Sequence, residues 1–559
     1  MRLLFITFSL FFTLISAQAA EKPLKIGISQ EFETLNPLIK QMMATTYIYG
    51  FVNRNLVTMN EKGEYIPMIA ESIPDFENGQ AKFITENGTK KIKANWKIKE
   101  EAKWGDGTPV TAYDVKLAWS TALLDTVSVG EKKTYSQVER IEIDPKNPKH
   151  FSFVYEEAMW NYYQLGSFYL LPAHLEKKVV KEHGEKVEGY AKNTLYTKDP
   201  TNPGLYNGPY LIDELKLGSH LILKPNPHFY GEKPNIKTII IKLIQNTGTL
   251  EANLRSGSID MVSVLGMSFD QALSFEKKVN LMNLPFNVNY KPSLVYEHID
   301  LNMENELLQD IKVRRALVHA IDRKKLTLAL FEGKQQMAYH NVAPLDPWYT
   351  DDPKKIRHYK PSKRKARKLL EKAGWKLKDD GFRYKDGKRL EFTIMTTAGN
   401  KTRELIQAFI QNEWKSVGIK LNIKNEPARV FFSQTVLKGE YPHMALFAWI
   451  SAPESVPRSS LHSSSIPTES NAFSGQNTGK WNNKQVDKII DELEFEFDSE
   501  ERKNMVAKLL KIYTDEVPVI PLYYRSDVSI TPEGLKNYVL TGHQYPNSNF
   551  AEQWTWETK

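Results

Sequence analysis

The chain has 559 residues, well beyond the roughly 250–300 residues at which a single hydrophobic core stops growing, so two or three domains are expected. Hydrophobic residues make up 41% of it and charged residues 25%, which excludes a wholly disordered or fibrous chain. It contains no cysteine, so disulfide frameworks, thiolate nucleophiles and cysteine-ligated zinc are excluded. The formal net charge of +8 would suit an anionic partner.

The N-terminal residues have the order of a secretory signal peptide. Arg2 precedes an apolar run from Leu3 to Ile15, and small residues follow from Ser16 to Ala20. This run is shorter than the roughly twenty apolar residues that a membrane span needs. We expect cleavage after Ala19 and export of the mature protein to a periplasm.

Strands come first in chain order, with one early helix. The apolar segment 24–29 predicts a strand, and 46–57 carries apolar residues at helical spacing. Further strands are expected at 91–99 and at 238–243, where Ile239, Ile241 and Leu243 alternate with their neighbours.

Helices are clearest in the second half. Apolar residues at i, i+3, i+4, i+7 and i+8 predict a helix over 313–321. Ser362 is suited to cap a helix that ends at Gly374, and apolar spacing predicts another over 486–493. A further helix is expected to open at Asp498 and to leave into a strand near Pro518. Alternating strands and helices indicate an α/β fold.

A basic segment runs from 353 to 378, where twelve residues are Lys or Arg and only Glu371 is acidic. The interpretation that we favour is a solvated helix face, because no nucleic-acid recognition motif accompanies it. No nucleic-acid partner is therefore expected.

Catalytic motifs are missing from the sequence. It has no glycine-rich phosphate loop, no G-x-S-x-G elbow and no H-E-x-x-H helix, and its twelve histidines show no ligand spacing. We therefore expect no catalytic residues, no metal site and no cofactor. A glycosidase that draws two acids from distant positions stays open as an alternative.

Several stretches, in order, resemble the bacterial extracellular solute-binding proteins of the peptide/nickel type, which are the periplasmic receptors of oligopeptide and dipeptide ABC importers. These stretches are WGDGTPVTAYDV (104–115), NGPYLIDEL (207–215), LILKPNPHFYGEKPNI (221–236), LRSGSIDMV (254–262), DIKVRRALVHAIDRKKL (310–326), SKRKARKLLEKAGW (362–375) and VPVIPLYYRS (517–526).

The resemblance implies an α/β, two-lobed periplasmic-binding-protein-like fold with a hinge and an extra inserted subdomain in the first lobe. The hinge would comprise 290–297 and 521–526. The implied boundaries are a signal peptide at 1–19, first-lobe segments at 20–60, 193–293 and 523–559, the inserted subdomain at 61–192 and the second lobe at 294–522.

The resemblance also suggests where a ligand would bind on the first lobe. In the peptide receptors the ligand lies extended between the lobes and pairs with the protein backbone. The first-lobe strand that does this follows an L-D-P motif, and here Leu35, Asn36 and Pro37 lead to Met42 and Met43. Adaptable methionines suit varied side chains, but packing beneath the subdomain would explain them equally well.

On the second lobe, the family has a tryptophan followed three residues later by an aspartate that pairs with the peptide's amine. Trp449 fits, and Ile450 adjoins it, but Ala452 occupies the aspartate position. Either Glu454 takes over this role, or the ligand has no free amine at that end. An exposed loop carboxylate is the alternative for Glu454.

A loop over 451–483 is rich in Ser, Asn, Gly and Pro. Its polar side chains could line a cleft, or they could belong to a solvated surface loop. Asn400 could face the same cleft. The candidates in the loop are Arg458, His462, Gln476 and Asn477.

We therefore expect a monomeric periplasmic receptor that binds a peptide and delivers it to a membrane ABC permease, and not an enzyme. A first alternative keeps the scaffold and changes the ligand to a nickel chelate, haem or a sugar. An exported hydrolase and a chaperone-like role are the remaining alternatives.

Overall fold

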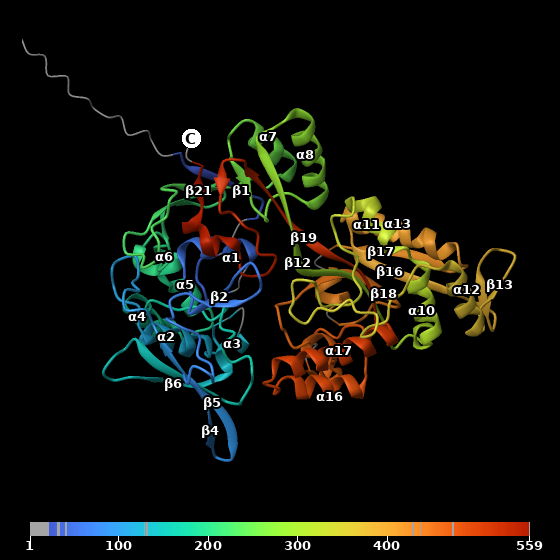
Figure 1. Ribbon diagram of the computed structural model, residues 1–559, viewed down its shortest axis with the longest axis horizontal. Coiled ribbons are helices and arrows are strands. Elements are labelled where there is room, and N and C mark those ends of the chain that lie inside the picture. Colours follow the sequence, from blue (N-terminus) through green and yellow to red (C-terminus); the bar gives the residue numbers. More distant parts are fainter. Residues whose placement is uncertain are drawn as a thin grey trace, which may run out of the picture.

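The computed structural model describes residues 22–30, 34–39, 42–127, 129, 132–427, 430–436, 438–471 and 475–557. The signal peptide expected at 1–19 lies outside these ranges. Two lobes lie side by side along the long axis of the molecule (Figure 1). No helix in the described ranges combines the length and the apolar character that a membrane crossing requires.

One ten-stranded sheet runs through both lobes. Its strands in spatial order are β17 (Lys420–Glu426), β16 (Glu391–Thr397), β18 (Met444–Ile450), β12 (Phe286–Leu301), β19 (Val519–Pro532), β11 (Met261–Val262), β1 (Leu24–Ile28), β10 (Ile239–Leu243), β9 (His220–Pro225) and β8 (Tyr210–Lys216).

The first lobe is built on β1, which pairs in parallel with β10 and β11. The strands predicted at 24–29 and 238–243 are confirmed as β1 and β10, in which Leu24, Ile26, Ile28, Ile239 and Ile241 are buried and Leu243 is half-buried. The helices of this lobe are α1 (Met43–Val52), α7 (Leu250–Arg255) and α8 (Phe269–Met282). Its two-stranded sheets are β2 (Val57–Met59) with β3 (Tyr65–Pro67) and β20 (Leu535–Lys536) with β21 (Thr555–Trp556).

Helix α1 differs from the expected helix at 46–57. It begins at Met43 and ends at Val52, because Asn53 takes an extended conformation and Val57 already opens β2. The apolar spacing therefore continued into β2, whose Val57 is buried in the same core as α1.

A separate four-stranded sheet in the order β4-β5-β7-β6 is attached to the first lobe. Thr111, in the WGDGTPVTAYDV segment, caps α2 in a capping box with Asp114. The elements are β4 (Ala81–Glu86), β5 (Thr89–Lys97), β6 (Val138–Ile143), β7 (His150–Tyr155), α2 (Ala112–Ala122), α3 (Lys132–Ser136), α4 (Ala173–His183), α5 (Gly189–Asn193) and α6 (Leu195–Lys198).

The second lobe confirms the predicted helices. Ser362 and Asp498 cap α12 and α17 by accepting backbone N–H groups of the first turn, and Gly374 has a φ of +91° just after α12. The helices are α9 (Glu306–Gln309), α10 (Ile311–Ala320), α11 (Arg323–Phe331), α12 (Lys363–Lys372), α13 (Lys401–Lys415), α15 (Arg458–Leu461), α16 (Lys484–Leu493) and α17 (Ser499–Glu516), with small strands β13 (Lys376–Leu377), β14 (Arg383–Lys385) and β15 (Lys388–Arg389).

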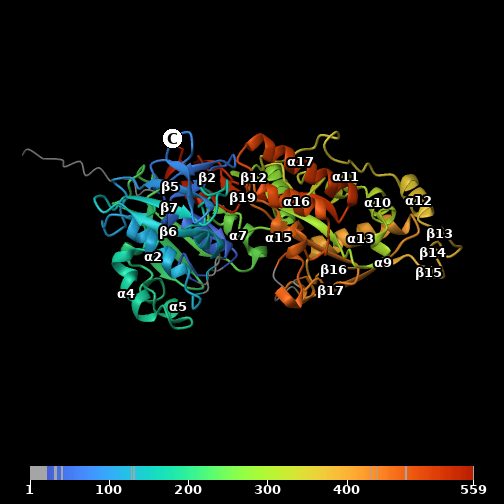
Figure 2. The same ribbon diagram turned by 90° about the horizontal axis from the view of Figure 1, so that it is seen from below.

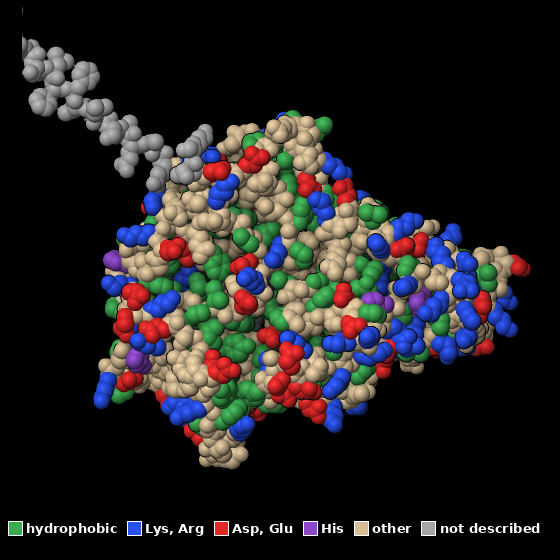
Figure 3. All heavy atoms as spheres, viewed as in Figure 1, with side chains coloured by type: hydrophobic (Ala, Val, Ile, Leu, Met, Phe, Trp, Pro, Cys, Tyr) green, Lys and Arg blue, Asp and Glu red, His purple; other side chains and the backbone are tan. Residues whose placement is uncertain are grey.

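The basic side chains of α12 lie on the surface, as the predicted solvated face requires. Ala366 and Leu370 point into the core of the second lobe, whereas Arg364, Lys365 and Arg367 are exposed. Lys and Arg side chains gather over this end of the second lobe in the space-filling view (Figure 3).

Two long strands connect the lobes. Strands β12 and β19 pair antiparallel along almost their whole length, and both halves of the sheet join through them. Their register shifts between Pro292, which pairs with Ser526, and Tyr296, which pairs with Tyr524. Before it, β12 packs on a first-lobe cluster through Tyr290, and after it β12 packs in the second-lobe core through Ile299, so the irregularity lies between the lobes. Figure 1 shows both strands running from one lobe to the other.

Away from these strands, the lobes touch through aromatic side chains. Trp160, which follows β7, lies 5.9 Å from Trp348 of the second lobe between ring centroids, and the guanidinium of Arg502 lies 3.9 Å from the Trp160 centroid. Phe497, between α16 and α17, contacts Phe76 and Phe83 beside and within β4. The lobes are thus in direct contact on the side of the sheet where α16 and α17 lie (Figure 2).

Candidate functional site

A pocket of about 130 Å³ opens in the second lobe where β18 ends. Trp449 and Ile450 are the last two residues of β18, and Tyr296 of β12 pairs directly with Trp449. The pocket is lined by Tyr296, Asn341, Val342, Asp346, Trp348, Trp449, Ile450, Ser451, Ala452, Ser455, Val456, Pro457, Ser459, Ser460, Gln476, Val506, Leu509 and Leu510.

Three of the residues expected at the ligand site line this pocket: Trp449, Ile450 and Gln476. The indole ring of Trp449 packs edge-on against Phe447 at 5.2 Å and remains partly exposed, and the side chain of Ile450 is 52% exposed. A partly exposed tryptophan at the mouth of a pocket presents a large apolar surface for contact.

A buried carboxyl group, that of Asp346, lies in the wall of the pocket that Ala452 also lines. Asp346 is only 7% exposed, and its Oδ1 accepts a hydrogen bond from the backbone N–H of Trp348 at 2.8 Å. Its Oδ2 accepts the backbone N–H of Glu454 at 3.1 Å, which ties the loop after β18 to the Asp346 turn. Burial raises the pKa of Asp346 to about 7, and the negative charge of Glu454 acts in the same direction.

Glu454 adopts an unusual backbone conformation next to this carboxyl group. Its φ of +52° lies in the left-handed region, which costs a non-glycine residue free energy of order 1 kcal/mol. Burial raises the pKa of its carboxyl, although the positive charges of Arg502 and Lys503 oppose the shift.

The pocket adjoins the contact between the two lobes. A Cβ placed on Gly63, in the turn between β2 and β3, would lie 3.5 Å from the Leu345 carbonyl oxygen and 3.9 Å from Pro453 Cγ. Burial raises the pKa of Tyr65 and Tyr163 in the first lobe, and the Glu454 carboxylate adds to both shifts. The loops that carry Asp346 and Glu454 therefore face the first lobe.

Three other expected site residues form ion pairs or hydrogen bonds with residues of their own lobe. Arg458 forms ion pairs with Asp491 and Glu494 of α16. His462 accepts the backbone N–H of Ser464, and the Asn477 amide donates to the backbone oxygens of its own loop and accepts from Trp481. These bonds hold the 451–483 loop together, and a ligand contact for these three residues stays a prediction.

The remaining expected residues lie outside this pocket. Met42 precedes α1, and Met43 is its first residue with 43% of its surface exposed. Asn400 caps α13 by accepting the backbone N–H of Arg403 at 3.1 Å. None of the three lines the pocket, and a ligand contact for them stays a prediction.

Asp346 and Trp348 were not among the residues singled out in the sequence. Their only local signal is turn chemistry, since an Asp whose side chain accepts the N–H two residues later forms an Asx turn. The bond to Glu454 spans 108 residues of sequence, so composition and spacing could not have found it.

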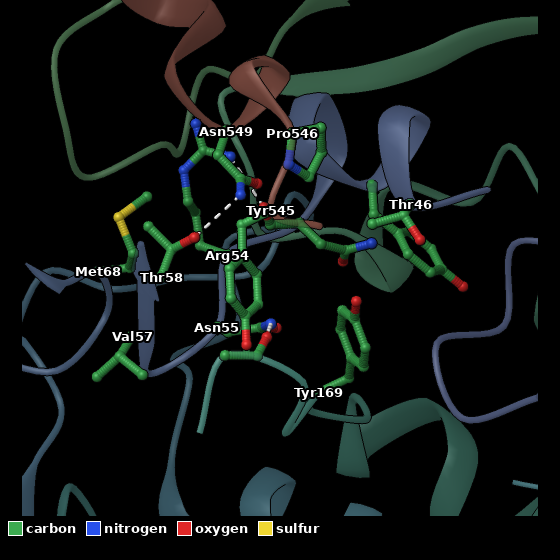
Figure 4. Close-up of a pocket in the computed structure, with 13 residues that line it drawn as sticks. Thr46, Arg54, Asn55, Val57, Thr58, Met68, Tyr169, Tyr545, Pro546 and Asn549 are labelled. Atoms are coloured by element: carbon green, nitrogen blue, oxygen red, sulfur yellow. Dashed lines mark hydrogen bonds between the residues drawn. The ribbon is translucent and has the colours of Figure 1, made fainter. Parts of the chain in front are cut away.

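A second, smaller cavity lies within the first lobe (Figure 4). Its volume of about 20 Å³ has room for about one water molecule. Arg54 in its wall is paired with Glu552 at 2.6 Å, and Asn549 donates to Thr58. A peptide could not enter this space without rearrangement.

A triad of charged side chains links β12, α13 and β19 in the second lobe. Glu297 of β12 is fully buried and accepts Arg403 Nε at 2.6 Å and Arg525 Nε at 2.9 Å. Burial by itself would raise the pKa of Glu297, but the positive charges of Arg525 and Arg403 outweigh it and lower the pKa. The carboxylate is therefore ionised and fixes α13 and β19 to β12.

Comparison with known proteins defines the class. The pattern of the bacterial extracellular solute-binding proteins, family 5, matches residues 64–471. The oligopeptide-binding protein AppA of Bacillus subtilis is 26% identical over 520 residues, which are 92% of this chain and 88% of AppA.

Solved structures share the fold over nearly the whole chain. An oligopeptide-binding protein of Thermus thermophilus, solved with a pentapeptide, is 26% identical with a TM-score of 0.72 and covers 96% of both chains. NikZ of Campylobacter jejuni, solved with Ni(L-His), shares the fold at 23% identity with a TM-score of 0.71, over 95% of this chain and 99% of NikZ.

The fold is that of a two-lobed periplasmic binding protein, as the sequence predicted. The chain belongs to the bacterial extracellular solute-binding proteins of family 5.

Proposed function

We propose that this protein captures a peptide between its two lobes and delivers it to an ABC-type import permease. One observation carries this proposal: an aromatic pocket in the second lobe adjoins the face of the first lobe. The sheet topology is consistent with it, because among the described strands β12 and β19 connect the two lobes. Relatives named as oligopeptide-binding proteins across nearly the whole chain support a peptide as the ligand.

The proposed hinge comprises 290–297 and 521–526. The register shift between Pro292 and Tyr296 supports it, because an irregular pair of strands can absorb a backbone rotation. The lobe boundaries that we propose are 20–60, 193–293 and 523–559 for the first lobe, 61–192 for its inserted subdomain and 294–522 for the second lobe. A ligand that touches both lobes would shift the population toward the closed form.

We further propose that the mature chain works in the periplasm as a monomer after removal of 1–19, and that it releases its ligand unchanged. Mass spectrometry of the exported protein tests the cleavage after Ala19. Chromatography of the peptide after incubation tests the second point, and peptide hydrolysis would assign the chain to the hydrolase alternative.

Isothermal titration calorimetry with a peptide library is the direct test. We expect heat of binding from at least one class of peptides and none from control sugars or nickel. Heat from another solute together with no heat from any peptide would refute the peptide assignment.

A non-peptide ligand is the second candidate. Ala452 in place of the expected aspartate favours it, because a peptide amine would need another negative partner. Native mass spectrometry of the purified protein would identify a nickel chelate, haem or sugar that co-purifies.

A further inference from the structure

We propose that the second-lobe pocket binds a positively charged amine of the ligand and that Asp346 is the negative partner of this amine. This inference rests on the proposed function and names the group that the pocket recognises. The inference assigns the role of amine partner to Asp346 and not to Glu454. The two residues are 108 positions apart in the sequence, and the backbone N–H of Glu454 donates a hydrogen bond to Asp346.

The first argument is the unmatched charge of Asp346. Its two oxygens accept one backbone N–H each, so each has a free acceptor position. Within the described ranges, no lysine, arginine or histidine forms an ion pair with Asp346, and the charged group that acts on it is the carboxylate of Glu454. A buried carboxyl without a cation is costly, and a ligand ammonium would supply the missing charge.

The second argument is the shape and lining of the pocket. Its volume of about 130 Å³ suits a small cationic group and not a whole peptide. Trp449 and Trp348 line it together with Asp346, and aromatic faces attract cations. Trp348 Nε1 is buried and finds no hydrogen-bond partner among the described residues, so it remains available to an acceptor group that accompanies the amine.

The third argument distinguishes Asp346 from Glu454. Asp346 lines the pocket, whereas the neighbouring loop contributes Ser451, Ala452 and Ser455 to the lining but not Glu454. The left-handed backbone of Glu454 places its N–H on Asp346 Oδ2. The strained residue thus orients the Asp346 carboxylate, which is how backbone strain is used at binding sites.

The experiment compares matched peptides that carry an N-terminal ammonium, an acetylated N-terminus, or an acetylated N-terminus with a lysine side chain. We expect acetylation to weaken binding by about 30-fold or more, since removal of one partner of a buried charge pair has effects of this size. Recovery by the lysine peptide would place a side-chain amine, and not the N-terminal amine, in the pocket.

The substitutions are Asp346→Asn, Glu454→Gln and Asp351→Asn. D346N should bind the free and the acetylated peptide with similar affinity. Asp351 is an exposed carboxylate in the same segment, so D351N controls for the change in net charge and should keep the preference for the amine. Loss of this preference in E454Q but not in D346N would overturn the assignment.

The pH dependence of the wild type provides a measurement that needs no variant. Burial raises the pKa of Asp346 to about 7. The titratable and charged groups near it and the adjoining Glu454 loop are Glu454, Arg502 and Lys503 on α17, and Tyr65 and Tyr163 on the first lobe. The ammonium requires the ionised form, so affinity should fall about fivefold from pH 7 to pH 6 for the free amine. The acetylated peptide should show no such fall.

The two proposals fail differently. Equal binding of free and acetylated peptides by the wild type would overturn the amine proposal and leave peptide capture intact. Absence of binding by every peptide, with binding of another solute, would instead refute the proposed function.

Discussion

At the scale of single residues, Trp449 offers the clearest separation of binding from folding. We expect Trp449→Ala to weaken ligand binding by about 1–3 kcal/mol, because a large aromatic surface at the mouth of the pocket is lost. The melting temperature of the ligand-free protein should hardly change, since the indole is partly exposed. Calorimetric titration and thermal unfolding of the same preparation measure both effects.

Trp414 is the matched control for this substitution. It is fully buried in the second lobe and donates Nε1–H to the Leu317 carbonyl oxygen at 3.1 Å. Trp414→Ala should reduce the free energy of unfolding by roughly 3–5 kcal/mol. If Trp449→Ala instead behaves like Trp414→Ala and leaves the affinity unchanged, Trp449 is a core residue.

The sequence indicated part of the pocket and not its carboxyl group. Trp449 and Gln476 could be proposed from a resemblance and from loop composition, and both line the pocket. Asp346 could not, because its significance depends on a hydrogen bond to Glu454 that only the folded chain creates. Arg458 illustrates the opposite case. Loop composition made it a candidate ligand contact, but in the structure its guanidinium is paired with carboxylates of α16.

At the scale of secondary-structure elements, the triad of Glu297, Arg403 and Arg525 joins β12, α13 and β19. We expect Glu297→Gln to lower the free energy of unfolding by about 3 kcal/mol, because the buried Arg403 loses its carboxylate. Arg525 is partly exposed and can be hydrated, which keeps the loss at the low end. Thermal unfolding at neutral pH measures it, with Glu306→Gln in the exposed Lys388–Glu306 pair as the neutral control.

The same triad predicts a pH dependence of stability. The pKa of Glu297 is lower in the folded protein than the ordinary value of about 4.3 in an unfolded chain. Its contribution to stability is therefore complete above this value and is lost as the pH falls through the folded pKa. The difference in melting temperature between wild type and Glu297→Gln should shrink below about pH 4. A constant difference down to pH 3 would contradict an ionised Glu297.

Helices were more predictable than their ends. Capping residues and apolar spacing located α12, α16 and α17, because both signals are local in sequence. The end of α1 was missed since the apolar spacing continues into β2, and only the extended backbone at Asn53 separates the two elements. Burial in one core gives a helix and a following strand the same composition.

At the scale of the whole molecule, the two-lobed fold could be predicted from ordered family motifs, but the contacts between the lobes could not. Trp160 lies in a different segment from Trp348 and Arg502, and no periodicity relates them. Under the proposed hinge in β12 and β19, these contacts would depend on how far the lobes close, and no local stretch of sequence encodes that.

Phe497 allows this closure to be tested. Its ring lies 5.6 Å from Phe76 and 5.1 Å from Phe83 between centroids, and these rings belong to the other lobe. Because the contact exists only when the lobes are together, Phe497→Ala should destabilise the closed form by about 0.5–1.5 kcal/mol and weaken ligand binding to the same extent. Small-angle X-ray scattering should show a larger radius of gyration at subsaturating ligand than the wild type has.

Phe495, in the same loop and 49% exposed, is the matched control, and Phe495→Ala should change neither the radius nor the affinity. Phe83→Ala removes the opposite side of the contact, so the double variant with Phe497→Ala should be little worse than either single variant. Additive effects of the two substitutions would mean that the rings act independently. In that case the aromatic contact between the lobes would not hold the closed form, and closure would depend on the ligand and the connecting strands.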